Sequence, residues 1–170
     1  MVLVVAALSR VPAVLAGRKP SHVLSLLGPE ADDPACGDTH HLVLRFNDII
    51  TPMAGYIAPS ADTVRAILNF GERWRADASG APLLVHCFAG ISRSTAAAYL
   101  LACAFSEPGR EEEIAQALRT ASPTATPNSL MIALADDMLA REGRMIRAVE
   151  ALGRGLFAAE GAPFDLVFGR

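Results

Sequence analysis

Short hydrophobic runs separated by turn residues occupy the first half of the chain. Three of them, 2–8, 21–27 and 41–46, are rich in Val and Leu and are bounded by Gly and Pro, which is typical of strands. A fourth run, 82–86, is continuously apolar, as in a strand buried on both faces. The pattern predicts a sheet with this fourth strand at its centre.

Helical periodicity predicts most of the remaining elements. The stretch 60–78 begins at a Ser suited to capping and repeats its apolar residues on one face. The stretch 94–105 is almost wholly apolar, as in a helix buried nearly all round. Weaker patterns predict helices over 109–121, 127–141 and 142–154. We therefore expect an α/β fold whose central, mostly parallel sheet has helices on both sides, the long helix on one and the late helices on the other.

The length and composition fit one domain. A chain of 170 residues with 52% hydrophobic and 19% charged residues can bury a core without disulfides or a structural metal. We predict a single domain over residues 1–170. Within it, residues 155–170 are weakly periodic and rich in Gly, Ala and Phe, so we expect a C-terminal tail folded back on the surface. The apolar start has no positive charge before it, which favours a buried strand over a signal peptide.

Charge and cysteine content exclude several functions. The net charge of -3, without a Lys/Arg cluster, gives no electrostatic footprint for nucleic acid or for a membrane surface, so we expect neither partner. Lys19 is the single Lys, and the Gly-Lys-Ser/Thr ending of a Walker-type loop cannot be built. Three irregularly spaced cysteines (Cys36, Cys87, Cys103) argue against a secreted disulfide framework, so we expect a cytoplasmic protein. The Arg- and Ala-rich composition suggests a bacterial gene.

The segment from His86 to Ser94 carries the strongest candidate chemistry. A thiol is a poor nucleophile at neutral pH unless its thiolate is stabilised, and a helix N-terminus does this for Cys87. The backbone N–H groups of the next five residues would form an anion-binding nest, and Gly90 permits a positive φ or a close backbone approach there. The planar guanidinium of Arg93 can bind two phosphate oxygens at once. The predicted phosphate-binding loop consists of Phe88, Ala89, Gly90, Ile91, Ser92 and Arg93.

This arrangement resembles the signature of the protein tyrosine and dual-specificity phosphatase superfamily, which is His-Cys, five residues, Arg, then Ser or Thr. Upstream, the segment Leu44-Arg45-Phe46-Asn47-Asp48-Ile49 resembles the general-acid segment of that family, and the resemblance implies Asp48 as the acid. Downstream, Pro127-Asn128 is similar to the Pro-Asn pair that opens a late helix in dual-specificity members. The similarity covers about residues 42–140 and implies a cysteine-phosphatase fold.

The resemblance also implies a mechanism of two phosphoryl transfers, without a cofactor or a metal. Cys87 would attack phosphorus while Asp48 protonates the leaving oxygen, giving a phosphocysteine intermediate. Asp48 would then activate water, Ser94 would hydrogen-bond the departing thiolate, and His86 would support the loop by bonding its backbone. Because the loop brings no cation besides Arg93, we expect a phosphorylated protein or a small phosphomonoester rather than a polyphosphorylated inositide. The choice between phosphotyrosine and phosphoserine or phosphothreonine stays open.

Plainer explanations exist for several of these residues. Asp48 also fits an ordinary turn, and Asn128 fits a helix N-cap without chemical function. Cys103 lies in an apolar helix and fits the core, whereas Cys36 could protect Cys87 by forming a disulfide. Two other functions also stay open: a catalytically silent phosphate-binding module, and a rhodanese-type sulfurtransferase, which also presents a cysteine in a strand–loop–helix anion cradle.

Overall fold

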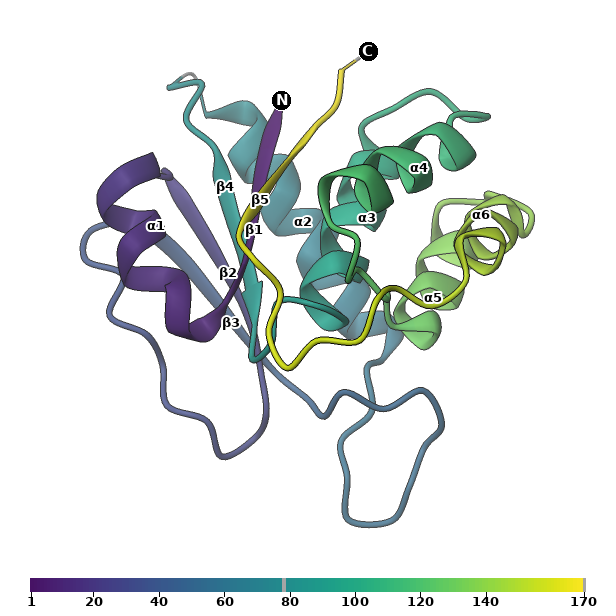
Figure 1. Cartoon of the computed structure of the whole chain (residues 1–170), viewed down its shortest axis with the longest axis horizontal. Helices are drawn as coiled ribbons and strands as arrows, with labels where there is room; N and C mark the ends of the chain where they lie inside the picture. The colour runs from purple at the N-terminus through teal and green to yellow at the C-terminus, as the bar shows by residue number, and fades with distance from the viewer. Residues whose placement is uncertain (78, 170) are drawn as a thin grey trace.

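The computed structural model describes residues 1–77 and 79–169, and five strands and six α-helices lie within them (Figure 1). In chain order the elements are β1 (Val2–Ala7), the 3-10 helix (Leu8–Arg10), α1 (Val11–Arg18), β2 (His22–Leu27), β3 (His40–Arg45), α2 (Ala61–Ala76), β4 (Leu83–Cys87), α3 (Arg93–Ala104), α4 (Glu111–Ala121), α5 (Ser129–Met138), α6 (Arg144–Leu152) and β5 (Phe164–Val167).

The five strands form one sheet in the order β3-β2-β4-β1-β5. The pairs β2–β3, β2–β4 and β1–β4 are parallel, and only β5 runs antiparallel, against β1. All five residues of β4 are buried. The predicted mostly parallel sheet and the central place of the fourth strand are both confirmed. Since β4 ends at Cys87, the segment of interest begins at the carboxyl edge of the sheet.

Helices cover both faces of the sheet, but not as the sequence predicted (Figure 1). Helix α1 lies on one face, while α2 packs with α3 and α5 on the other. Strand order explains this difference, because crossovers between parallel strands are right-handed. The connection from β1 to β2 runs across the sheet in one direction, and the connection from β3 to β4 runs in the other. The two crossover helices must therefore lie on opposite faces, and the chain after β4 stays on the face of α2.

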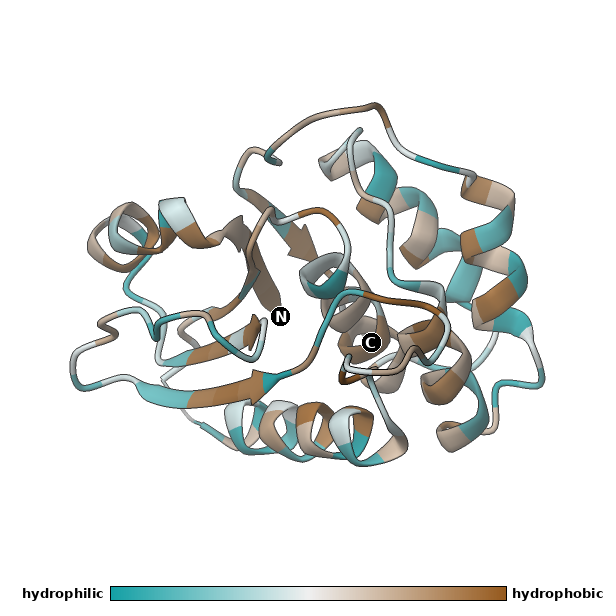
Figure 2. Ribbon diagram, turned by 90° about the horizontal axis from the view of Figure 1, so that it is seen from below, coloured by the Kyte–Doolittle hydropathy of each residue, from teal (hydrophilic) through white to brown (hydrophobic). Residues whose placement is uncertain are grey.

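Two hydrophobic cores result from this layering. The larger lies under α2–α6 and takes Leu83, Val85 and Cys87 from β4, whereas the smaller lies under α1 and takes Leu84. This alternation follows from the two-residue period of a strand. Figure 2 shows hydrophobic residues along the strands and, on the long helix α2 at its lower edge, a mixture of hydrophobic and hydrophilic residues. The capping box between Ser60 and Thr63 fixes the start of that helix.

Two elements differ from the predicted pattern. Helix α1 was not predicted, because its eight residues are few and Gly17 near its end also fits a boundary between two strands, although Pro in the first turn is typical of a helix start. The predicted surface tail over 155–170 is wrong where β5 adds an edge strand to β1, and Leu166 and Phe168 are buried. Helix α2 ends at Ala76, and the predicted last residue of this helix, Ala78, lies outside the described residues, as does Arg170.

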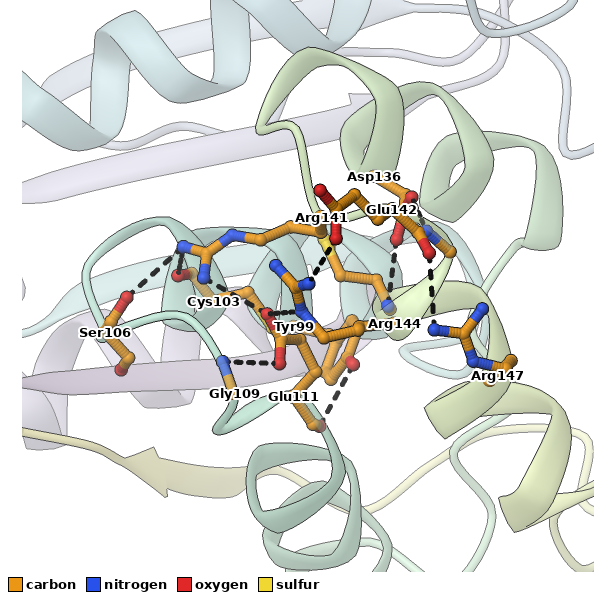
Figure 3. Close-up of polar contacts among 12 residues, drawn as sticks. Tyr99, Cys103, Ser106, Gly109, Glu111, Asp136, Arg141, Glu142, Arg144 and Arg147 are labelled. Carbon is orange, nitrogen blue, oxygen red and sulfur yellow. Dashed lines mark hydrogen bonds and ion pairs between the residues drawn. The ribbon is translucent and has the colours of Figure 1, made fainter.

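A buried ionic cluster joins the helices that follow β4 (Figure 3). The Glu111 carboxylate at the start of α4 accepts a hydrogen bond from the Arg141 guanidinium at 3.1 Å and lies 3.4 Å from Arg144 Nε. Arg141 also donates to the carbonyl oxygens of Cys103, at 2.7 Å, and Ser106, at 3.2 Å. The cluster therefore ties the turn between α5 and α6 to the C-terminal end of α3.

Replacement of Glu111 by Ala is expected to destabilise the fold strongly, because it leaves Arg141 buried without its carboxylate. The free energy of unfolding should fall by about 3–5 kcal/mol. Urea denaturation followed by the fluorescence of Trp74 measures this change. The control is Glu113→Ala, since the pair of Glu113 with Arg110 is exposed to solvent and its loss should change the free energy of unfolding far less. Equal losses in the two variants would contradict a structural role for the buried cluster.

Candidate active site

The loop between β4 and α3, residues 88–92, has its backbone arranged for an anion. The carbonyl oxygens of Phe88, Ala89 and Ile91 accept hydrogen bonds of 2.8–3.2 Å from backbone N–H groups outside the loop. Within the described parts of the chain, no backbone N–H of residues 88–92 has a protein acceptor. Backbone donors without a protein acceptor are available to a bound anion.

Gly90 allows the loop to pack directly on β1. Its φ is +71°, in the region that favours glycine, as the tight loop predicted. A Cβ at this position would lie 2.7 Å from the Ala7 nitrogen and 2.9 Å from the Ala6 carbonyl carbon. Both atoms belong to backbone in the middle of the sheet, which cannot move aside. The loop therefore depends on glycine for two separate reasons.

Replacement of Gly90 by Ala is expected to distort the loop and to weaken phosphate binding at least roughly tenfold, because an anion site made of backbone groups tolerates little displacement. Calorimetric titration with inorganic phosphate measures the effect. Gly37→Ala is the matched control, since Gly37 also has a positive φ, +57°, but has open space where a Cβ would be. Similar phosphate affinity in the two variants would show that the contact with β1 is unimportant.

Cys87 lies at the base of a pocket of about 370 Å³ at this loop. The thiol is buried, and its Sγ lies 3.1 Å from Ser94 Oγ in the first turn of α3. A hydroxyl at that distance can donate a hydrogen bond to a thiolate. The pocket is lined by Asp48, Cys87, Phe88, Ala89, Ile91, Ser92, Arg93, Ala158 and Ala159.

The guanidinium of Arg93 is held by a hydrogen bond at Nη1, while its Nε makes no hydrogen bond to the described residues. Its side chain is buried, its Nη1 donates to the Phe46 carbonyl at 2.9 Å, and its guanidinium carbon lies 5.8 Å from the centre of the Phe46 ring. Among the described residues, the buried Nε has no hydrogen-bond acceptor. An unpaired buried N–H of a cation beside a pocket is costly unless a ligand satisfies it. The sequence did not indicate that Phe46 orients Arg93.

Asp48 reaches this pocket from the loop after β3. Its Oδ1 accepts hydrogen bonds from Ser92 Oγ, at 2.7 Å, and from Asn128 Nδ2, at 2.8 Å, while its Oδ2 lies 3.9 Å from Arg93 Nε. Asn128 also caps α5 by accepting from the Met131 N–H at 3.1 Å. The structure therefore brings Asp48, Arg93 and Asn128 together, and Asn128 acts as an N-cap and as a partner of Asp48 at once.

His86 points away from the pocket, to the opposite face of β4. Its Nε2 lies 2.5 Å from Ser25 Oγ, which in turn lies 2.7 Å from His41 Nε2. Burial is the main cause that lowers the pKa of His86 to about 4, so the ring is neutral at neutral pH. The hydrogen-bond partner of its Nε2 is thus a side chain on β2, while its Nδ1 has no hydrogen-bond partner among the described residues, so the predicted bond to the loop backbone is not seen there.

The other two cysteines lie away from the pocket. Cys36 belongs to the small core on the face of α1, and its Sγ lies 3.8 Å from His41 Nε2. The Cys87 side chain belongs to the larger core on the other face, so the structure does not place the two for a disulfide. Burial raises the pKa of Cys103 to about 12, which agrees with its interpretation as a core residue.

A segment that the sequence did not indicate also borders the pocket. Residues 153–163, here called the C-terminal strap, run from α6 to β5 across the carboxyl edge of the sheet (Figure 1). The Gly161 N–H donates to the Ala89 carbonyl at 2.8 Å, and the Glu160 carboxylate accepts hydrogen bonds from Ser9 and Arg10. The sequence signals for the close approach of the strap to the neighbouring loops are Gly155 and Gly161. From the sequence alone, these two glycines look like ordinary loop glycines.

No group of three His, Cys, Asp or Glu side chains within residues 1–77 and 79–169 is placed to hold a metal ion. None of the helices in that part of the chain has the length and apolar character needed to cross a bilayer.

No protein-family model and no curated protein matches the sequence, but solved structures match the fold. The structure of DUSP15 aligns with a TM-score of 0.63 and 22% identity over 87% of this chain and 90% of that chain. The Yvh1 phosphatase domain from Chaetomium thermophilum gives 0.59 and 21% over 84% and 93%. PTPMT1 in complex with PI(5)P gives 0.58 and 16% over 86% and 94%. The chain therefore has the fold of the protein tyrosine and dual-specificity phosphatases, as the resemblance of its cysteine loop implied.

Proposed function

We propose that the protein is a cysteine-dependent phosphatase that hydrolyses phosphomonoesters, with phosphotyrosine or dual-specificity activity on phosphorylated proteins. One observation carries the proposal. A buried thiol, Cys87, lies beneath a loop whose N–H groups find no acceptor among the described residues, next to Arg93, whose Nε donates no hydrogen bond within that part of the chain. A phosphate dianion would satisfy all of these donors, and its phosphorus would then stand above the sulfur.

In the first step, the Cys87 thiolate attacks phosphorus in line and the bond to the leaving oxygen breaks. The loop N–H groups of residues 88–92 and Arg93 hold the equatorial oxygens. Asp48, which lines the same pocket, gives its proton to the leaving oxygen. Asn128 and Ser92 orient that carboxyl group by the hydrogen bonds they donate to it.

In the second step, water attacks the phosphocysteine, Asp48 as a carboxylate accepts the proton of that water, and the thiolate departs. Ser94 supports this departure, since its hydroxyl, 3.1 Å from the sulfur, can donate to the developing negative charge. Two phosphoryl transfers thus return Cys87 to its starting state, and His86 holds β4 from the opposite face through Ser25.

Turnover of an aryl phosphate by the purified protein, with a chelator and a reductant present, tests the proposal. We expect metal-independent release of phosphate. Absence of turnover combined with binding of inorganic phosphate would instead indicate a silent phosphate-binding module. A persulfide on Cys87, detected by mass spectrometry after incubation with thiosulfate, would indicate a rhodanese-type sulfurtransferase. None of the three solved structures above is named a sulfurtransferase, so the comparisons give that alternative no support.

Replacement of Asp48 by Asn is expected to lower kcat by roughly 10²-fold or more, because the amide cannot supply the proton. The loss should grow as the leaving group becomes more basic, since a poorer leaving group depends more on protonation. A series of aryl phosphates with different phenol pKa values measures this dependence. Asp62→Asn is the control, because Asp62 lies exposed in the first turn of α2. A loss of equal size for all leaving groups would contradict the role of Asp48 as the acid.

A further inference from the structure

Exposed hydrophobic side chains gather around the candidate active site. Within the described residues, seven of the nine large exposed hydrophobic side chains lie on the loop 48–59, the phosphate loop and the C-terminal strap. Scattered single residues of this kind need no explanation, but a cluster around one site indicates a binding surface. The seven are Ile50, Met53, Tyr56, Ile57, Phe88, Leu156 and Phe157.

A groove of about 1170 Å³ opens directly from the catalytic pocket. The two share Asp48, Ile91, Ser92 and Ala158 in their linings, so they form one continuous depression. The groove has roughly three times the volume of the pocket, 1170 against 370 Å³. A phosphorylated side chain in the pocket would leave the groove open for the residues next to it.

Hydrophobic side chains line two sides of the groove. Ile50 and Met53 come from the loop after β3, and Leu156 and Phe157 come from the strap. All four are more than half exposed, and Phe157 is fully exposed. These groups bury little surface in the protein alone, so covering them with an apolar partner would be favourable.

The strap presents its two side chains on a fixed backbone. The Leu156 N–H donates to the Pro123 carbonyl at 2.9 Å, and the Gly155 N–H donates to Thr126 Oγ1 at 3.1 Å. A Cβ at Gly155 would meet the Thr124 carbonyl carbon at 2.5 Å, so the strap lies directly against the loop before α5. Hydrophobic groups held in this way bind a partner with a small entropic cost.

Charge and polarity favour a peptide over a lipid bilayer as the occupant. Among the described residues that line the groove, Arg154 alone is basic, and the net charge of the chain is -3, so an anionic bilayer would gain little attraction. Thr51 and Ser129, whose hydroxyl groups can form hydrogen bonds, also line the groove. Such groups suit the backbone of an extended peptide better than acyl chains.

We propose that this groove binds the residues next to the phosphorylated residue of a protein substrate, and that it selects apolar side chains there through contact with Leu156 and Phe157. The inference deepens the proposed function and names its substrate class, a phosphopeptide with hydrophobic residues beside the phosphorylated one. It rests on the phosphate site at Cys87 and Arg93, with which the groove is continuous.

Binding of labelled phosphotyrosine peptides to Cys87→Ser protein, measured by fluorescence anisotropy, tests the inference without relying on turnover. One peptide carries Leu and Ile beside the phosphotyrosine, and a second carries Ser at both places. We expect the first to bind at least roughly tenfold more tightly, the size expected from burying two apolar side chains in part. Addition of Leu156→Ser and Phe157→Ser should remove most of this difference. Val167→Ser, which changes an exposed hydrophobic residue on β5, should leave it unchanged.

Equal affinity for the two peptides, or a difference that survives the double substitution, would overturn the inference. Tighter binding to vesicles containing a phosphatidylinositol phosphate than to the apolar peptide would also overturn it, in favour of a lipid substrate. The proposed function is tested separately by aryl phosphate turnover of the protein with Cys87 intact. Selective peptide binding without such turnover would refute the phosphatase and keep the groove.

Discussion

Replacement of Cys87 by Ser is expected to abolish phosphatase activity while leaving phosphate binding intact. A hydroxyl of similar size keeps the pocket and its hydrogen bond to Ser94, but it is a far weaker nucleophile than a thiolate at neutral pH. The turnover of an aryl phosphate should fall by roughly 10⁴-fold or more, as for other lost nucleophiles. Steady-state assays and calorimetric titration with inorganic phosphate measure the two effects on the same preparation.

Cys36→Ser is the matched control for this substitution. Cys36 is also a free cysteine, but it lies on the opposite face of the sheet and contacts His41 instead of the pocket. Its replacement should change turnover less than about twofold. Comparable turnover in Cys87→Ser protein and the wild type would rule out Cys87 as the nucleophile. If Cys87→Ser protein lost both phosphate binding and turnover, the substitution would have disrupted the loop instead of removing only the nucleophile.

The loop 88–92, which we propose binds phosphate, was the most predictable part of the molecule because its determinants are local. A buried strand, a five-residue loop with Gly90 and a buried helix are consecutive in the sequence, so their relative placement follows from chain geometry. Gly90 could be identified as a special position without coordinates. Its contact with Ala7 could not, because that contact requires knowledge that β1 pairs with β4.

The partners of the site residues were not predictable in the same way. Asp48 and Asn128 are 80 residues apart, and nothing in either segment indicates that the amide donates to the carboxylate. The Phe46 carbonyl that holds Arg93 is a backbone group and leaves no mark on the sequence. Contacts of this kind depend on tertiary packing, which local patterns do not encode.

The same limit explains the error in the placement of α2 and the missed strap. Periodicity identified α2 and its buried face, but the side of the sheet on which it lies depends on strand order. The strap has no periodicity, because its backbone bonds connect it to the loops around it instead of to a neighbouring strand. Weak periodicity at the C-terminus predicts a tail folded back on the surface, and it does not reveal that backbone hydrogen bonds fix this segment beside the pocket.

Replacement of Arg93 by Lys is expected to lower kcat/KM by roughly 10³-fold or more, although the charge is kept. The guanidinium donates to the Phe46 carbonyl through Nη1, while Nε has no hydrogen-bond acceptor among the described residues and can donate to phosphate. An ammonium group is a single point donor on a flexible stem and cannot hold both positions at once. Because the developing charge on the equatorial oxygens is greatest in the transition state, kcat should fall as well as the affinity for inorganic phosphate.

Arg45→Lys is the control for Arg93→Lys, because it makes the same substitution outside the pocket. Arg45 also donates to backbone carbonyls, of Gly28 and Ala31 among others, but it is exposed and lies outside the pocket. Its replacement should leave kcat/KM within about twofold of the wild type. If Arg93→Lys kept more than about a tenth of the activity, charge alone would suffice at this position, and the forked geometry held by Phe46 would have no part in catalysis. A large loss of kcat/KM in Arg93→Lys but not in Arg45→Lys would instead show that the guanidinium, held by the Phe46 carbonyl, stabilises the phosphoryl group during its transfer.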